Sequence, residues 1–370
     1  MDTPFIHFTI GTKAQFIKMA PLMYLLEKRL IPYHLLDLSQ HGTLSGAIME
    51  DFGLAPPSVK QLKDSQTLIK TYWQAVTWFF GSLRYLLKPR RRVLQELFAG
   101  KKGIALIHGD TLSTLLGLYL ARAAGLKTGL VEAGLTSDRL FNPFPEEFIR
   151  RYVEKRVDYL FAPGDEASAH LRRRYAKSHQ IINTHYNTGK DALQLMLSLH
   201  PGHIGFQGEY IVITVHRLET IRSRQKLARI VEYIESIASR GVNIQFYMHP
   251  PTEDALKRFR MMDKLSAIQG LHIRPLLPYR EFAHVLANAK FIITDGGSIQ
   301  EEASYLAKPC VILRSTTERP HGLRVSAILT TWDAKKDIDF LHQERIINEN
   351  EEQETMKAAS IILDACFHAP

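Results

Sequence analysis

Three acidic residues near the middle of the chain have types and spacing that suit proton transfer. Asp110 follows the apolar run 104–107, Glu132 follows the apolar run 128–131, and Glu146 comes after a proline-bearing loop. Neighbouring carboxylates push each other's pKa values apart, so that one can serve as an acid and another as a base. The alternative is that Asp110 and Glu146 are ordinary helix caps, positions that acidic residues favour.

The elements around these residues read as a strand–helix–strand unit. Residues 104–107 and 128–131 are short apolar runs typical of buried parallel strands. Residues 112–124 between them have helical character, and Gly125 is a predicted C-cap. Ligands of open α/β sheets bind outside the carboxyl ends of the strands. We therefore predict that these carboxylates reach one crevice.

A glycine-bearing turn in the second half of the chain suits a diphosphate. Gly296 and Gly297 follow a predicted strand and open a helix, where the backbone can approach an anion closely. Ser298 can cap that helix, and Glu302, about one turn further on, can accept hydrogen bonds from ribose hydroxyls. A plain glycine-rich turn with a capping serine is the alternative.

Histidine and basic residues lie at two further strand ends. His216 and Arg217 follow a predicted strand, where they could touch phosphate or substrate, although a lone histidine at such a place is more often structural. Lys13 and Lys18 lie in and after the first strand-to-helix turn and could contact a phosphate. Many strand-to-helix turns look similar, so this signal is weak by itself.

The loop around residues 276–282 is a candidate contact for a nucleotide base. Tyr279 and Phe282 offer aromatic faces there, and the backbone offers polar groups.

Bulk properties narrow the class of protein. A chain of 370 residues favours two domains. The amino-terminal residues lack a basic region and lead into a strand, so we expect no secretory signal. The chain has only two cysteines, and such sparse use of cysteine is typical of proteins in a reducing cytoplasm, where disulfides are rare. The sixteen histidines show no metal-ligand spacing, so we expect no metal and no cofactor.

The net charge of +9 implies attraction to an anionic partner. Nucleic acid ranks last among the candidates, because no nucleic-acid-binding motif is present. The aromatic–basic segment, residues 71–92, reads as a core-facing helix followed by a solvated basic turn. The alternative is peripheral contact with an anionic membrane, at the inner face of the plasma membrane.

Strands alternate with helices in both halves, which predicts an α/β fold with two Rossmann-like, doubly wound parallel sheets. The cleft between two such sheets is the default ligand site. We place the first domain at residues 1–188 and the second at 189–350. Residues 351–370 form a predicted carboxyl-terminal helix, for which packing back on the first domain is the expected placement.

Several segments together resemble the UDP-N-acetylglucosamine 2-epimerase family. They are GTKAQFIKMAPL (11–22), HGDT (108–111), VEAGL (131–135), PFPEE (143–147), NTGKDAL (187–193), TVHRLE (214–219), HPPT (249–252), TDGGSIQEE (294–302) and TTERP (316–320). The resemblance covers nearly the whole chain. It implies a glycosyltransferase-B-like fold, binding of a UDP-sugar in the cleft, and a homodimer.

The resemblance also implies a reaction and roles for residues. UDP is eliminated anti across C1–C2 of the sugar and is added back with inverted configuration at C2, for surface polysaccharide synthesis. The matched positions are the acid/base residues Asp110, Glu132 and Glu146, the catalytic or phosphate-binding His216, and Lys18, Gly297, Ser298 and Glu302 near UDP. Arg319 lies within the matched TTERP segment and is a further candidate UDP contact.

The sequence departs from the family pattern in the surroundings of sugar and phosphate. Lys13 stands where the family has arginine, Ala14 and Gln15 replace Pro-Glu, and Leu218 replaces an arginine. A hydrolysing 2-epimerase that releases UDP and free sugar, a UDP-sugar-dependent glycosyltransferase at the inner membrane, and a non-catalytic UDP-sugar-binding module therefore stay open as alternatives.

Overall fold

Seven parallel strands form the sheet of the first compact unit, in the order β3-β2-β1-β4-β5-β6-β7. The computed structural model describes residues 4–38, 44–62, 72–136, 145–202, 206, 208–317, 322–323, 325–342 and 356–368. The strands are β1 (Phe5–Ile10), β2 (Tyr33–Asp37), β3 (Val59–Gln61), β4 (Gly103–His108), β5 (Lys127–Val131), β6 (Tyr159–Ala162) and β7 (Gln180–Asn183).

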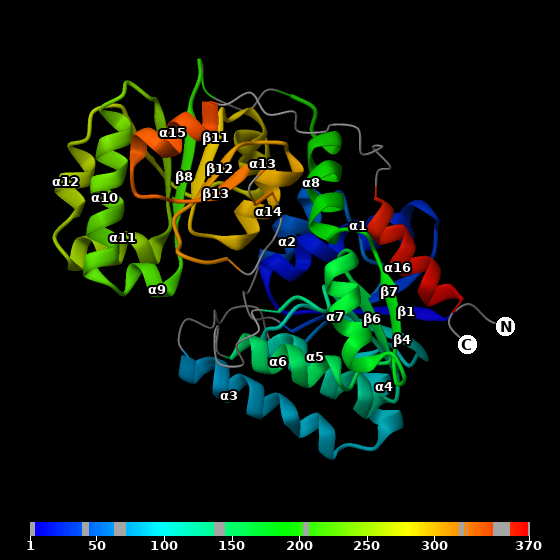
Figure 1. The fold of residues 1–370 in the computed structure, drawn as a ribbon. Helices are drawn as coiled ribbons and strands as arrows, with labels where there is room; N and C mark the ends of the chain where they lie inside the picture. Colours follow the sequence, from blue (N-terminus) through cyan, green and yellow to red (C-terminus); the bar gives the residue numbers. More distant parts are fainter. Residues whose placement is uncertain are drawn as a thin grey trace. The chain divides into compact units, whose positions relative to one another are not determined.

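Helices cover both faces of this sheet. They are α1 (Lys13–Lys28), α2 (Leu44–Asp51), α3 (Tyr72–Ser82), the 3-10 helix η1 (Leu83–Leu87), α4 (Arg90–Leu97), α5 (Leu112–Ala124), α6 (Glu146–Glu154), α7 (Asp165–Tyr175), α8 (Thr188–Leu199) and α16 (Lys357–Phe367). Figure 1 shows α3, α4, α5 and α6 on one face and α1, α8 and α16 on the other. Gly125, with φ of 73°, ends α5 as a left-handed C-cap.

The second unit repeats the plan with a six-stranded parallel sheet, in the order β10-β9-β8-β11-β12-β13. Its strands are β8 (Ile211–Val215), β9 (Ile244–Met248), β10 (Leu271–Arg274), β11 (Phe291–Thr294), β12 (Cys310–Ile312) and β13 (Ala327–Leu329). Its helices are α9 (Leu218–Ile221), α10 (Arg224–Ala238), α11 (Pro250–Arg258), α12 (Met262–Ser266), α13 (Tyr279–Asn288), α14 (Gly297–Tyr305) and α15 (Ala334–His342). The predicted fold of two doubly wound parallel sheets is therefore confirmed.

The strand orders place a topological switch point in each unit. In the first sheet β1 lies beside β4, and in the second β8 lies beside β11, so that the chain winds away from each pair in opposite directions. Crevices at such points are where doubly wound sheets bind ligands. The strands flanking the switch points are buried along almost their whole length, which explains why most of their residues are apolar.

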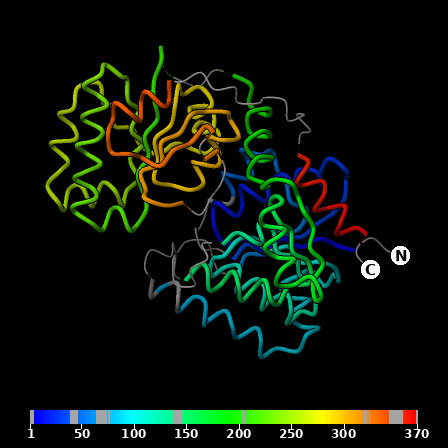
Figure 2. The backbone as a smooth tube through the Cα atoms, in the orientation of Figure 1, coloured from blue at the N-terminus to red at the C-terminus, as the bar shows by residue number. Residues whose placement is uncertain are grey.

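The compact units run from Met1 to Leu199 with the carboxyl-terminal segment, and from His200 to Gln353. Helix α8, which the sequence analysis assigned to the second domain from residue 189, packs on α1 within the first unit. Figure 2 shows the carboxyl-terminal helix α16 in red beside the blue α1, and the two helices are in contact. Among the described residues, no helix is long and apolar enough to cross a bilayer.

Candidate functional site

Glu132 stands at the carboxyl end of β5 with an unusual backbone. Its φ is 66°, a left-handed value that costs energy for a residue other than glycine. The buried carboxylate accepts a hydrogen bond from Lys18 Nζ and lies 3.2 Å from His108 Nε2. Three elements converge here, because Lys18 comes from α1 and His108 from the end of β4. Strained residues cluster at functional sites, and this turn has that character.

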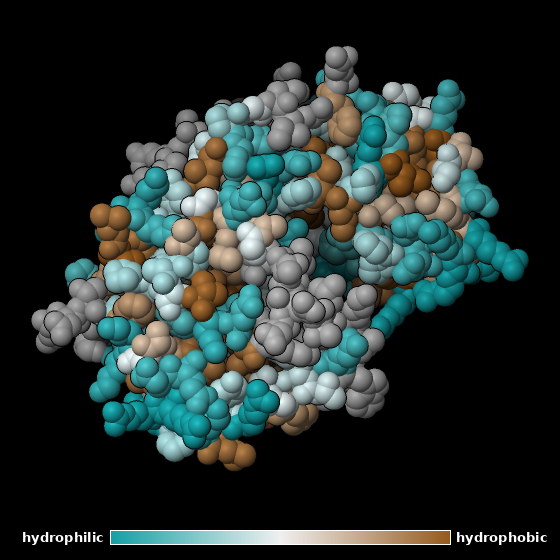
Figure 3. All heavy atoms as spheres, turned by 180° about the vertical axis from the view of Figure 1, so that it is seen from behind, coloured by the Kyte–Doolittle hydropathy of each residue, from teal (hydrophilic) through white to brown (hydrophobic). Residues whose placement is uncertain are grey.

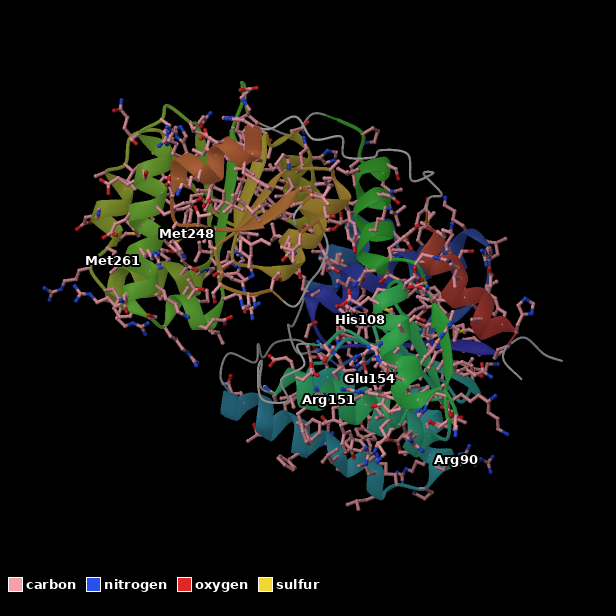
Figure 4. The ribbon with its side chains drawn as sticks, in the orientation of Figure 1. Arg90, His108, Arg151, Glu154, Met248 and Met261 are labelled. Carbon is pink, nitrogen blue, oxygen red and sulfur yellow. The ribbon has the colours of Figure 1, made fainter. Side chains whose placement is uncertain are left out.

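Asp110 belongs to a chain of ion pairs next to Glu132. Arg150 of α6 donates to the Asp110 carboxylate and also to Glu147 Oε2, at 2.6 Å. Burial opposes the charge on Arg150, but Asp110 and Glu147 outweigh burial and raise the pKa of the guanidinium. Glu147 is fully buried, and Arg151 Nε and Thr136 Oγ1 also donate to it. Figure 4 shows His108 at β4, and Arg151 and Glu154 along α6.

Glu146 is the first residue of α6. It is not the N-cap, which is Pro145. Among the described residues, its buried Oε2 atom has no hydrogen-bond partner, in contrast to the well-paired Glu147 beside it. This Oε2 atom can accept a hydrogen bond from a ligand.

Gln15 joins the turn after β1 to the turn after β4. Its Nε2 atom donates to the carbonyl oxygen of His108 at 2.7 Å and to Thr111 Oγ1 and Thr114 Oγ1 at 3.0 Å. Its Oε1 atom accepts from the backbone N–H of Gly11 at 2.9 Å. An amide can do both, whereas a carboxylate only accepts. The two turns that flank the switch point are locked together through this one side chain.

In the second unit, the buried Asp295 plays a similar joining role. Its carboxylate accepts from the backbone N–H of His216 at 2.9 Å and of Arg217 at 3.0 Å. Asp295 follows β11 and the other two residues follow β8, so these two hydrogen bonds connect the turns on either side of the switch point. The His216 ring stacks on His249 with centroids 4.6 Å apart. Arg217 points to Glu219, with which it forms an ion pair.

The amino end of α14 lies beside His216. Gly296 is the N-cap of α14, and the helix has no side-chain capping bond. Ser298 lies inside the first turn, so the prediction that Ser298 caps this helix is wrong. A Cβ atom at Gly296 would lie 2.4 Å from His216 Cε1, so a residue other than glycine would force the His216 ring to shift. Backbone N–H groups at an uncapped helix start suit an anion.

Glu302 and Tyr279 form a pair in this unit. The Tyr279 hydroxyl donates to Glu302 Oε1 at 3.3 Å. Burial, with the charge of Glu302, raises the pKa of Tyr279 well above its ordinary value, so the hydroxyl stays protonated. Tyr279 therefore orients Glu302, whereas the sequence suggested an aromatic contact with a base. Phe282 packs edge-on against Tyr247, at 5.2 Å between centroids, within the core.

The remaining residues that the sequence proposed for the site are Lys13, Gly297 and Arg319. Lys13 is the first residue of α1 and is half-buried. Gly297 is the first residue of α14. Arg319 lies outside the described residues. Within the described ranges, no group of three or more histidine, cysteine or acidic residues is arranged to hold a metal ion.

Three residues that the fold brings to the first unit's site had no functional role assigned from the sequence. They are His108, Gln15 and Arg150. His108 had a visible signal, because it lies in the same strand-end turn as Asp110. Gln15 was visible only as a departure from the family pattern, since its partner His108 lies 93 positions away. Arg150 had no signal, since Asp110 lies 40 positions away in the chain.

Comparisons with known proteins point in one direction. The sequence profile of the UDP-N-acetylglucosamine 2-epimerase family matches residues 26–363. The chain is 30% identical over 342 residues to the UDP-N-acetylglucosamine 2-epimerase of Methanocaldococcus jannaschii, covering 89% of this chain and 88% of the relative. It is also 30% identical over 364 residues to the enzyme of the same name from Bacillus subtilis, covering 95% and 89%.

The solved structures agree with these relatives. The crystal structure of the M. jannaschii UDP-GlcNAc 2-epimerase in complex with UDP-GlcNAc and UDP superposes with a TM-score of 0.78 at 27% identity, covering 96% of this chain and 98% of that one. The UDP-GlcNAc-bound 2-epimerase from Neisseria meningitidis superposes with a TM-score of 0.75 at 25% identity, covering 97% and 98%.

Proposed function

Because this chain belongs to the UDP-N-acetylglucosamine 2-epimerase family, we propose that it inverts C2 of a UDP-2-acetamido sugar by anti elimination of UDP and re-addition. The observation that supports the proposal is that Asp110 and Glu132 follow the neighbouring strands β4 and β5, both lie within electrostatic reach of Arg150, and have different partners. Glu146, at the start of α6, is the third candidate carboxylate. Different environments let one carboxyl accept a proton while another gives one.

The chemistry balances without any external reagent. A carboxylate takes the C2 proton while the C1–O bond to the diphosphate breaks, so that the electron pair of C2–H forms the C1=C2 double bond and UDP leaves with the electrons of the C1–O bond. In the return step, a UDP oxygen attacks C1 and a carboxylic acid delivers a proton to C2 from the opposite face. We assign the two proton transfers to Asp110 and Glu132, with Glu146 as the third polar group at the sugar.

The second unit would supply the nucleotide-binding groups. The start of α14 at Gly296 and Gly297 offers N–H groups to the diphosphate. Arg217 offers positive charge as UDP leaves, and the neighbouring His216 ring offers a hydrogen-bonding group. Glu302, held by Tyr279, suits the ribose hydroxyls. Lys13, Lys18, Ser298, Phe282 and Arg319 remain further candidate contacts.

Turnover of UDP-GlcNAc in deuterated water tests the proposal. Deuterium at C2 of the sugar, together with the C2 epimer of the UDP-sugar, supports it. UDP with free sugar would instead indicate a hydrolysing enzyme, and UDP that appears only with an acceptor would indicate a transferase. Absence of any turnover would contradict the proposal. Asp110→Asn, Glu132→Gln and Glu146→Gln should each lower turnover by about a hundredfold or more.

We also propose that the aromatic–basic segment contacts an anionic membrane peripherally. Phe80 and Leu87 are 65% and 89% exposed, and Arg91 is exposed close to Leu87 in the chain. At the lower edge of Figure 3, apolar side chains stand beside a hydrophilic cluster. Trp78 by contrast is buried and donates to the Leu38 carbonyl, which supports a core-facing role for the same helix. Residue 71 and the side chains of residues 72, 73, 75 and 76 lie outside the description.

Liposome sedimentation at low salt separates these two interpretations. Leu87→Ser should weaken binding to vesicles containing phosphatidylserine, whereas Leu30→Ser, at a residue that is 91% exposed on another part of the unit, should not. Equal binding by both variants would contradict membrane contact.

A homodimer is the remaining proposal on partners, and light scattering that gives the mass of a single chain would contradict it.

A further inference from the structure

A fourth carboxylate of the first unit, Glu154, supports the turn that carries Glu132. Glu154 is the last residue of α6 and only 1% exposed. Its Oε1 atom accepts a hydrogen bond from the backbone N–H of Gly134, at 2.8 Å. Gly134 is two residues after Glu132, so this hydrogen bond lies in the same turn as the candidate acid/base group.

The turn from Glu132 to Gly134 is tightly held and strained. Both ends have left-handed backbones, with φ of 66° at Glu132 and 84° at Gly134. Ala133 N–H donates to the Phe161 carbonyl at 2.9 Å, and a Cβ atom at Gly134 would lie 2.6 Å from the Ala167 carbonyl oxygen. Strained backbone persists only where its surroundings hold it. Loss of the hydrogen bond that Gly134 N–H donates to Glu154 would let the turn relax and move the Glu132 carboxylate away from Lys18.

The surroundings of Glu154 make its charge sensitive to pH. Burial, the largest influence, raises the pKa of this carboxyl to about 7, while the hydrogen bond from Gly134 and the charge of Arg150 lower it. Glu147 on α6 raises it further and Arg174 on α7 lowers it, and the Tyr175 hydroxyl of α7 also lies within electrostatic reach. An ionised carboxylate accepts a stronger hydrogen bond than a protonated one. The turn is therefore held more firmly above neutral pH.

We propose that Glu154 is a positioning residue for Glu132. The ionised carboxylate of Glu154 fixes the turn in the geometry that proton transfer requires. This inference rests on the proposed function for its kinetic consequence. Glu154 does not touch the reacting atoms. It acts on the rate through Glu132. It also acts through Arg150, which lies one turn earlier than Glu154 on α6 and pairs with Asp110.

The test is the pH profile of kcat for wild type and Glu154→Gln. In the wild type, kcat should rise through a step near pH 7 as Glu154 ionises. The glutamine still accepts from Gly134 N–H but cannot ionise, so its kcat should stay at the low-pH level, about tenfold below the wild-type plateau, because a charged hydrogen bond is worth about 1.4 kcal/mol more than a neutral one. KM should change by less than about twofold, because no substrate contact is lost.

Asp191→Asn is the matched control. Asp191 is likewise buried in the first unit with its pKa raised by burial to about 7, but its partner is Ala359 of α16. Its variant should keep the kcat step. Superimposable pH profiles for Glu154→Gln and wild type, or loss of the step in Asp191→Asn as well, would overturn the inference.

A readout without activity separates this inference from the proposed function. In protein labelled with carboxyl-¹³C glutamate, the Glu154 signal, identified by its loss in Glu154→Gln, should titrate near pH 7. The Glu132 signal, identified by its loss in Glu132→Gln, should shift over the same interval. A Glu132 signal that ignores the titration of Glu154 overturns positioning. Absence of turnover with both signals moving together would reject the epimerase function alone.

Discussion

At the scale of single residues, the site depends on side chains that connect turns. Gln15 joins the turns after β1 and β4, Asp295 joins the turns after β8 and β11, and Glu154 supports the turn after β5. All three are buried and use their hydrogen-bonding atoms on backbone groups. Buried polar groups that lose a partner cost more than the bond itself contributes. Changes at these residues should therefore affect stability or ligand geometry strongly.

Gln15→Glu should destabilise the first unit by about 3 kcal/mol, because a buried carboxylate cannot donate to the His108 carbonyl and faces it with like charge. Urea unfolding measures the change. Gln61→Glu, at an exposed residue of β3, should stay within about 0.5 kcal/mol of wild type. Equal stability of the two variants would show that the connection by Gln15 has little weight.

Gly296→Ala should weaken UDP binding by about tenfold or more, a loss of about 1.4 kcal/mol. The reason is steric, since the added Cβ meets the His216 ring at 2.4 Å while the backbone, with φ of −90°, accepts alanine without strain. Calorimetric titration with UDP measures the affinity. Gly46→Ala, where a Cβ meets nothing within 4 Å, is the control and should bind as wild type does. Unchanged affinity in Gly296→Ala would argue against a ligand at the start of α14.

At the scale of elements, α16 shows how a helix from the far end of the chain becomes part of the first unit. Its N-cap is Met356, in a left-handed conformation without a side-chain capping bond. Asp191 of α8 replaces that cap, because its Oδ2 atom accepts from Ala359 N–H at 2.7 Å. Arg29, the C-cap of α1, donates to Ser360 Oγ at 3.2 Å on the outer side. Contacts from two helices therefore fix α16.

The Asp191 carboxyl should make the stability of the first unit depend on pH. Burial raises its folded-state pKa from 3.8 to about 7, so the fold favours the protonated form. Its contribution is present below about pH 4 and is lost as the pH rises toward 7. Asp191→Asn cannot ionise, so its free energy of unfolding relative to wild type should increase over this interval in urea titrations. A difference in the free energy of unfolding between Asp191→Asn and wild type that stays constant over this interval would refute the assignment.

At the scale of the whole molecule, the excess of positive charge matters most for association. The chain carries 47 lysine and arginine residues against 38 acidic ones. A positive field attracts a nucleotide diphosphate and speeds its encounter, while leaving the chemistry after binding unchanged. Both switch points present cationic side chains, Lys18 in one unit and Arg217 in the other.

Raising the salt concentration should therefore lower kcat/KM for the UDP-sugar while kcat stays constant. Between about 20 and 300 mM NaCl the Debye length shrinks from about 20 Å to about 6 Å, which screens the field. Steady-state kinetics measures both parameters. Uridine, which has no charge, is the matched ligand, and its calorimetric affinity should not change with salt. A salt effect of equal size on uridine would point away from electrostatic attraction.

The sequence by itself determined the elements and the strand ends at which the candidate residues Asp110 and Glu132 lie. The apolar runs before Asp110 and Glu132 are β4 and β5, and the predicted helix 112–124 with its Gly125 cap has the observed bounds. Only the tertiary structure decided which groups face those carboxylates. Lys18 reaches Glu132, and Arg150 reaches Asp110, because the strand order brings β1, β4 and β5 side by side and α6 beside α5. Periodicity reports which face of an element is buried, a local property, whereas pairing across 114 positions depends on how strands are ordered, which no local pattern encodes.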